Sequence, residues 1–80
     1  MMAVYFIRAI GDDFDAADDG VEYADAAEAQ RAAVRAAIAL ASEEITDERR
    51  SSIVEARVED EGEAIARFAV ALSVEPLEVQ

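Results

Sequence analysis

Carboxylates are the only side chains in this sequence that are numerous and close enough to suggest a chemical site. Five of them lie within eight residues: Asp12, Asp13, Asp15, Asp18 and Asp19. Hard divalent cations prefer oxygen ligands of this kind. The acidic segment is therefore the first candidate for a metal site or a contact loop.

The spacing within this segment does not match a calcium-binding loop. If Gly20 is aligned with the invariant glycine of an EF-hand, Ala17 and Ala26 occupy the third and twelfth positions, which must supply oxygen ligands. We therefore interpret the five aspartates as a solvated acidic loop that can contact a partner. Weak Ca²⁺ or Mg²⁺ binding stays as the alternative.

The residue types that carry most enzyme chemistry are missing from the 80 residues, which contain no His, Cys or Lys. Zinc sites, cysteine nucleophiles, imidazole bases and Schiff bases are therefore excluded. The three glycines are too scattered for a dinucleotide-binding loop. Paired carboxylates can act as acid and base only in a shielded cleft, which a wet loop does not provide. We predict that the chain is not an enzyme and uses no cofactor.

The net charge of −12 limits the kinds of partner. Phosphate backbones and anionic lipids repel such a chain, so we expect no direct nucleic-acid binding and no membrane binding. No apolar run approaches the roughly 18 residues that span a bilayer. Residues 1–8 also lack the basic start and long apolar core of a signal peptide, so we expect a cytoplasmic protein.

Hydrophobic patterning predicts the elements that position these residues. Strands are expected at about 3–10, 21–23, 53–59 and 64–74, where β-branched and aromatic residues cluster or alternate with polar ones. The segment Asp18-Asp19-Gly20 is the expected turn into the second strand. Asp60-Glu61-Gly62 is the expected hairpin turn, in which Gly62 takes the left-handed conformation.

An alanine-rich segment at about 26–45 predicts the only helix. Asp25 is its expected N-cap, with Glu28 three residues later. The apolar residues at helical spacing are expected to face the sheet: Ala27, Val34, Ile38, Ala41 and Ile45.

These elements predict one α+β domain, residues 1–80, with the order ββαββ. Its four-stranded, mostly antiparallel sheet carries the helix on one face. The short second strand and the alternating third strand look like edges, which favours the strand order 2-1-4-3 over the alternative 2-1-3-4. Because much of the apolar content is alanine, the core is small and the monomer is expected to be marginally stable.

One helix covers only one face of a sheet, and the residues on the other face form a candidate interaction face. Alternation places seven of them there: Val4, Phe6, Arg8, Ile10, Arg57, Ile65 and Arg67. We interpret the arginines as cross-strand ion pairs with Glu55 and Glu59, with a small anion-binding strip as the alternative. The four apolar residues form an exposed patch, unless the strand register is off by one residue.

Several features of the chain also occur together in one known family. They are the aromatic strand Tyr5-Phe6-Ile7, the acidic turn Asp18-Asp19-Gly20-Val21-Glu22, Asp25 before an alanine-rich helix, the turn Asp60-Glu61-Gly62 and an apolar closing strand. In these the chain resembles a family of short, single-domain bacterial proteins of unknown function, common in alphaproteobacteria. The resemblance implies the ββαββ layout and supplies no catalytic residues.

The function predicted from these features is that of a non-enzymatic protein-interaction module. We expect a homodimer that uses the uncovered sheet face or the edge of the last strand. One alternative is an acidic regulatory protein that binds a basic partner, as antitoxin-like or nucleic-acid-mimicking proteins do. The other alternative is a weak divalent-cation binder.

Overall fold

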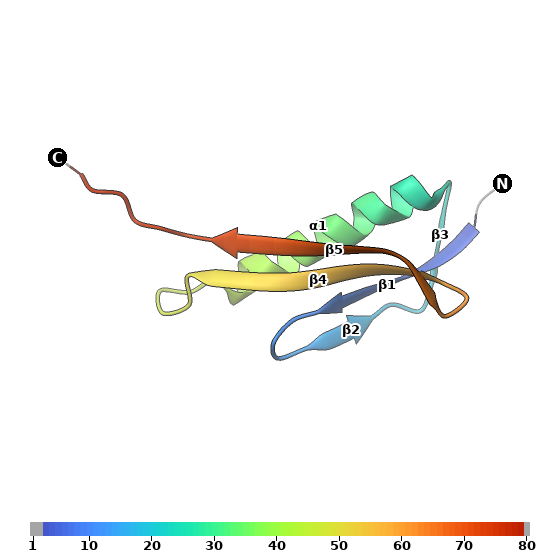
Figure 1. Cartoon of the computed structure of the whole chain (residues 1–80), viewed down its shortest axis with the longest axis horizontal. Helices are drawn as coiled ribbons and strands as arrows, with labels where there is room; N and C mark the ends of the chain where they lie inside the picture. Colours follow the sequence, from blue (N-terminus) through green and yellow to red (C-terminus); the bar gives the residue numbers. More distant parts are fainter. Residues whose placement is uncertain (1–2, 80) are drawn as a thin grey trace.

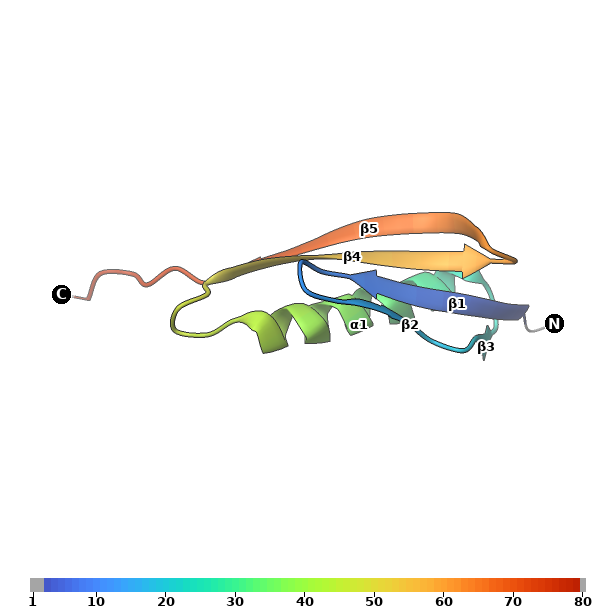
Figure 2. The same cartoon turned by 90° about the horizontal axis from the view of Figure 1, so that it is seen from below.

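The structure, a computed structural model, describes residues 3–79 as a five-stranded antiparallel sheet with one helix across it (Figure 1). The elements are β1 (Ala3–Ile10), β2 (Asp15–Ala17), β3 (Val21–Tyr23), α1 (Ala26–Glu44), β4 (Ser51–Asp60) and β5 (Glu63–Ser73). The α+β class and the single helix on one face of the sheet are confirmed (Figure 2). The four-strand count is wrong by one short strand.

The strands lie in the order β2-β1-β4-β5, with β3 also paired to β1. The four predicted strands 1, 2, 3 and 4 correspond to β1, β3, β4 and β5. The expected order 2-1-4-3 is therefore wrong, and the alternative 2-1-3-4 is the one observed. Polar alternation in β4 suggested an edge strand. In the structure β4 lies centrally, with β1 on one side and β5 on the other. Alternation of polar and apolar residues shows only that the two faces of a strand differ, and it does not show whether the strand lies at an edge.

The acidic segment contains the strand that sequence patterning missed. Both β2 and β3 pair antiparallel with β1, and the pairing shifts by one residue between them. The interruption is Asp18-Asp19-Gly20, which is therefore a bulge within one hairpin partner of β1 and not the expected turn. The turn itself lies earlier, where the Gly11 N–H donates to the Phe14 carbonyl at 2.9 Å.

The Asp18 side chain holds this bulge together. Its Oδ1 accepts the N–H of Ile7 at 3.0 Å and the N–H of Gly20 at 3.1 Å. Gly20 has φ 97°, and a Cβ there would press against the Phe6 and Val4 side chains. The Asp18 carboxylate thus accepts a β1 N–H that a backbone carbonyl would accept in a regular antiparallel pair.

The helix begins as expected, because Asp25 caps it by accepting the Glu28 N–H at 2.9 Å. The expected sheet-facing stripe is wrong in four of its five members. The fully buried residues are four alanines at spacing four: Ala29, Ala33, Ala37 and Ala41. Small side chains let the helix axis approach the sheet closely, and the larger Val34 and Ile38 then face sideways, about a quarter turn away.

The core between helix and sheet is thin. On the sheet it comprises Val54, Ala56 and Val58 of β4 and Ala9 of β1, with β5 residues such as Phe68 packed beside them. The largest fully buried side chains are Val54 and Val58. These strand faces agree with the predicted alternation.

The β4–β5 hairpin turns at Glu61 and Gly62, whose φ values of 52° and 85° match the type I′ geometry that suits twisted strands. Gly62 takes the left-handed conformation that was predicted for it. Two residues later the register slips, since Glu59 lies opposite Ala64 and Val58 opposite Ala66. Ile65 therefore has no partner on β4 and lies at a bulge.

Candidate functional site

Three arginines lie in a row across the outer face of the sheet. Arg8 of β1 is directly opposite Arg57 of β4, which is directly opposite Arg67 of β5. Three like charges side by side repel one another unless carboxylates separate them. The row is therefore stable only because of its acidic neighbours.

Each of these arginines has a carboxylate. Arg8 binds Asp15 through two N–H groups, at 2.7 and 2.5 Å. Both other arginines bind Glu55, at 2.9 Å in each case, and Arg57 also lies 3.7 Å from Glu59. Three positive and three negative groups balance within this face, so it has no cationic excess to bind an anion.

Glu55 pairs with two of the three arginines, Arg57 and Arg67. Hydrogen bonds from Arg67 and Arg57 lower the pKa of its carboxyl to about 2. The Arg8 guanidinium likewise lowers the pKa of Asp15. Both shifts arise because hydrogen bonds to the charged form favour it, which marks these groups as structural ion pairs and not as proton donors near neutral pH.

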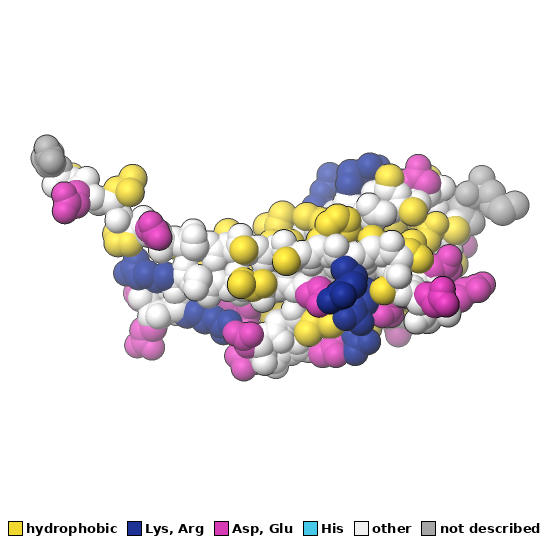
Figure 3. Space-filling view, in the orientation of Figure 1, with side chains coloured by type: hydrophobic (Ala, Val, Ile, Leu, Met, Phe, Trp, Pro, Cys, Tyr) yellow, Lys and Arg dark blue, Asp and Glu magenta, His cyan; other side chains and the backbone are white. Residues whose placement is uncertain are grey.

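Six of the seven residues of the predicted interaction face lie on the outer face, and the seventh, Ile65, lies at the bulge of β5. The apolar residues of the predicted face differ in exposure: Val4 and Ile65 are 46% and 45% exposed, and Phe6 and Ile10 are half-buried. In Figure 3 the centre of this face is charged. Whether these residues contact a partner stays a prediction.

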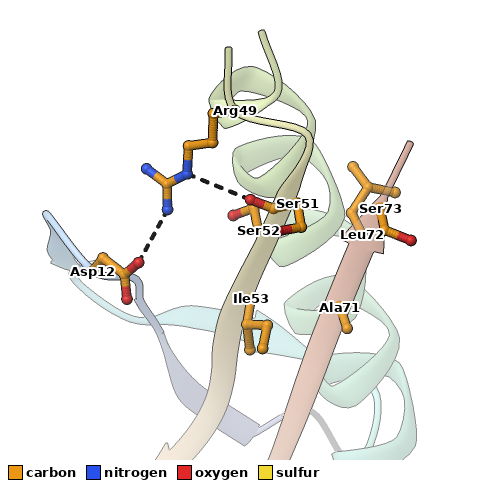
Figure 4. Close-up of a pocket in the computed structure, with 8 residues that line it drawn as sticks. All are labelled: Asp12, Arg49, Ser51, Ser52, Ile53, Ala71, Leu72 and Ser73. Atoms are coloured by element: carbon orange, nitrogen blue, oxygen red, sulfur yellow. Dashed lines mark hydrogen bonds and ion pairs between the residues drawn. The ribbon is translucent and has the colours of Figure 1, made fainter. Parts of the chain in front are cut away.

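Most of the predicted acidic contact loop is engaged within the chain. The Arg49 guanidinium lies 3.1 Å from Asp12 (Figure 4). It also lies 3.6 Å from Asp13 and 3.4 Å from Glu44. This arginine thus ties the β1–β2 turn to the end of the helix. Its partners Asp12 and Asp13 remain largely solvent-exposed.

The remaining acids of the loop have different roles. Asp15 pairs with Arg8, Asp18 holds the bulge, and Asp19 is exposed. Among residues 3–79, no three carboxylates are grouped so that they could hold a metal ion. Asp15 and Asp18 therefore stabilise the hairpin of β1 with β2 and β3, and Asp12 and Asp13 tie its turn to Arg49. Sequence spacing alone does not reveal these roles.

A surface that sequence reasoning did not identify lies between α1 and β5. It is an apolar groove lined by Ala27, Gln30, Arg31, Val34, Arg35 and Phe68. Ile38, 45% exposed, follows Val34 by one helical turn on the same side. Figure 3 shows hydrophobic side chains gathered along this line between β5 and α1.

The groove borders a free strand edge. Within the described residues nothing pairs with the second edge of β5, which is 11 residues long. Natural edge strands are usually shortened, bulged outward or protected by Pro and inward charges. This strand has a bulge at Ile65 near its start, one charged residue between its ends, Arg67, and no proline. The stretch from Ala66 to Ser73 therefore has neither a bulge nor a proline.

This combination defines a class: a small acidic α+β domain with an open sheet edge beside an apolar helix flank. Residues 4–71 match the model of one protein family, the Domain of unknown function (DUF6894). The chain therefore belongs to that family. No curated protein and no solved structure was found to match it.

The helix carries no sign of a membrane-spanning segment. No helix in residues 3–79 is both long enough and apolar enough to cross a bilayer.

Proposed function

We propose that the chain is a non-enzymatic interaction module that forms a homodimer by antiparallel pairing of two β5 strands. The observation that carries this proposal is the free β5 edge with the α1–β5 groove alongside it. Two identical edges related by a two-fold axis run antiparallel, so each can satisfy the other's free N–H and C=O groups.

Side chains support the same arrangement. Pairing the two edges brings the helices of both copies onto one face of a continuous sheet. The helix flank that carries Val34 and Ile38 and the strand edge beside Phe68 then face the other copy. Aliphatic side chains that are exposed in the monomer gain burial in this way, which is the main driving force for protein association.

The dimensions of the single chain also favour a second copy. Its accessible surface is 5676 Å², against about 4,700 Å² expected for a compact monomer of this mass. Its radius of gyration is 14.8 Å, against about 12 Å for 80 residues. Part of the excess comes from the extended C-terminal segment, and the rest reflects a flat two-layer body.

The edge is a better interface than the outer face. The outer face already neutralises its charges internally, and covering it would require these ion pairs to lose water without gaining new partners. The α1–β5 side needs no such desolvation at Val34, Ile38 and Phe68.

Sedimentation equilibrium on the full chain and on two matched variants tests the proposal. We expect a dimer at micromolar concentration for the unmodified chain. Ile38→Glu places a carboxylate in the interface twice per dimer and is expected to raise the dimer Kd by roughly 100-fold or more.

The control is Ile53→Glu, since Ile53 is 64% exposed on the outer face, away from the groove. Its dimer Kd should stay within about two-fold of the unmodified value, because the proposed interface does not include it. A chain that remains monomeric at hundreds of micromolar, or equal effects of the two variants, contradicts the proposal.

A further inference from the structure

The segment after β5 is the most exposed apolar stretch of the described chain. Val74, Leu77 and Val79 are 47%, 85% and 95% exposed. Acidic residues alternate with them in the sequence Val74-Glu75-Pro76-Leu77-Glu78-Val79. Large aliphatic side chains left in water forgo burial, so this segment has the composition of a docking peptide.

The direction of the segment is set where it leaves the sheet. The Val74 N–H donates to the Arg50 carbonyl at 2.8 Å, which continues the line of β5 for one more residue. In Figure 1 the segment then runs away from the body, at the end of β5 far from the start of α1. It therefore leads away from the α1–β5 groove of its own copy.

The groove has chemistry that complements this segment. Its floor is apolar, with Ala27, Val34 and Phe68, and Arg31 and Arg35 lie along it. Arg31 and Arg35 are one turn apart on the helix, and neither lies within ion-pairing distance of a carboxylate among residues 3–79. In a chain of net charge −12, two adjacent arginines beside an apolar groove suit an apolar, acidic occupant.

Antiparallel pairing of two β5 strands brings residues 74–79 of one copy to the α1–β5 groove of the other. For this, the two strands overlap through their second halves, with Leu72 and Ser73 next to the two-fold axis. Residues 74–79 of one copy then pass residues 66–71 of the partner's β5, and Leu77 lies opposite Phe68 beside the groove. Six extended residues reach about 20 Å, enough to run along the groove.

We propose that residues 74–79 of each copy dock in the α1–β5 groove of the other, with Leu77 on the apolar floor and Glu75 and Glu78 against Arg31 and Arg35. This inference rests on the proposed homodimer. The segment lies beyond residues 4–71, the part of the chain that matches the family model.

The first test compares the dimer Kd of the full chain with that of a chain ending at Val74, which keeps the hydrogen bond to Arg50. Each dimer loses two docked segments, and we expect the Kd to rise about 100-fold. Reversing both acids (Glu75→Arg with Glu78→Arg) should also weaken the dimer. Adding Arg31→Glu and Arg35→Glu to that variant should recover most of the loss.

The second test uses the absence of cysteine, which makes introduced thiols unique. Chains with Leu77→Cys mixed with chains with Ala27→Cys should form a disulfide-linked heterodimer under mild oxidation. Neither variant alone should cross-link, because equivalent positions lie at opposite ends of the dimer. Ala39→Cys, exposed on another side of the helix, is the negative control partner.

The outcomes separate this inference from the proposed function. A dimer whose Kd does not change when the segment is removed, or that cross-links Leu77→Cys equally to both helix positions, overturns segment exchange and leaves β5 pairing intact. An intramolecular disulfide in a Leu77→Cys/Ala27→Cys chain shows docking within one copy and likewise overturns the exchange. A full chain that is monomeric overturns both.

Discussion

At the scale of single residues, most charges of the outer face and the acidic loop act on one another. The outer face holds three arginines and three carboxylates that neutralise each other, although the chain as a whole has a net charge of −12. Asp12 and Asp13 are held by Arg49, which lies in the connection between α1 and β4. Most aspartates of the loop thus stabilise the fold through contacts within the chain.

Glu55 makes stability depend on pH in a defined direction. Its pKa falls from 4.5 to about 2 because Arg67 and Arg57 bind the charged form. The corresponding stability is complete above the ordinary pKa and is lost as the pH falls from about 5 toward 2. Glu55→Gln should be less stable than the unmodified chain at pH 7, and this difference should shrink over that interval.

Urea unfolding at a series of pH values and one protein concentration measures the difference. Glu63→Gln is a suitable control, since Glu63 is exposed on the same sheet and makes no ion pair among the described residues. A difference between Glu55→Gln and the unmodified chain that stays constant from pH 7 to pH 2 would show that Glu55 is not bound in this way.

Asp18 is predicted to be the most important of the loop acids for stability. Asp18→Ala removes an acceptor from two backbone N–H groups and is expected to cost about 1–2 kcal/mol. Asp18→Asn keeps an equivalent oxygen and should cost less. Asp19→Ala should be nearly neutral, and an equal cost at both positions in urea unfolding would argue against the bulge.

At the scale of elements, the helix and sheet are joined by small side chains. The four fully buried helix residues are alanines, and they face β4, whose buried residues are also small. Close approach gives good packing but little buried area. It also turns Val34 and Ile38 toward the open β5 side, where Val34 lines the groove and Ile38 follows it one turn later.

The alanine contact predicts a position-dependent response to larger side chains. Ala33→Leu inserts volume where Ala33 has no exposed surface, and it should destabilise the fold by about 1–3 kcal/mol. Ala39→Leu, on an exposed position of the same helix, should change stability by less than about 0.5 kcal/mol. Thermal or urea unfolding of the two variants measures this difference, and equal effects would contradict the packing of Ala33 against the sheet.

At the scale of the whole molecule, the fold is a flat pair of layers. The chain measures 56 × 25 × 15 Å, and its long dimension includes the extended C-terminal segment (Figure 1). The charged side chains of the outer face are paired with one another, and the short strands β2 and β3 form one edge of the sheet. The other edge, β5, and the adjoining helix flank remain open. The shape therefore directs association to one side.

Association through that side makes thermal stability depend on concentration. Because a dimer is stabilised by mass action, the Tm of the unmodified chain should rise when the protein concentration is raised about 100-fold. The Ile38→Glu variant should show no such rise. Differential scanning calorimetry provides the measurement, and a concentration-independent Tm for the unmodified chain would contradict dimerisation.

The sequence by itself determined what depends on neighbouring residues. Strand β1, strand β3, the Asp25 cap, the Glu61–Gly62 turn and the inward and outward faces of β1, β4 and β5 follow from local periodicity and capping chemistry. These features arise within a few residues of the chain, so local patterns are sufficient to predict them.

Tertiary structure alone decided what depends on distant partners. Asp18-Asp19-Gly20 looks like a turn until Ile7 is placed opposite Asp18, and β4 looks like an edge until β1 and β5 are placed on either side. The helix stripe was assigned by size, yet the close approach of the sheet selects Ala29, Ala33, Ala37 and Ala41 instead of Val34 and Ile38. Packing distance is a property of two elements together, and so the open apolar groove beside β5 has no signal in either element alone.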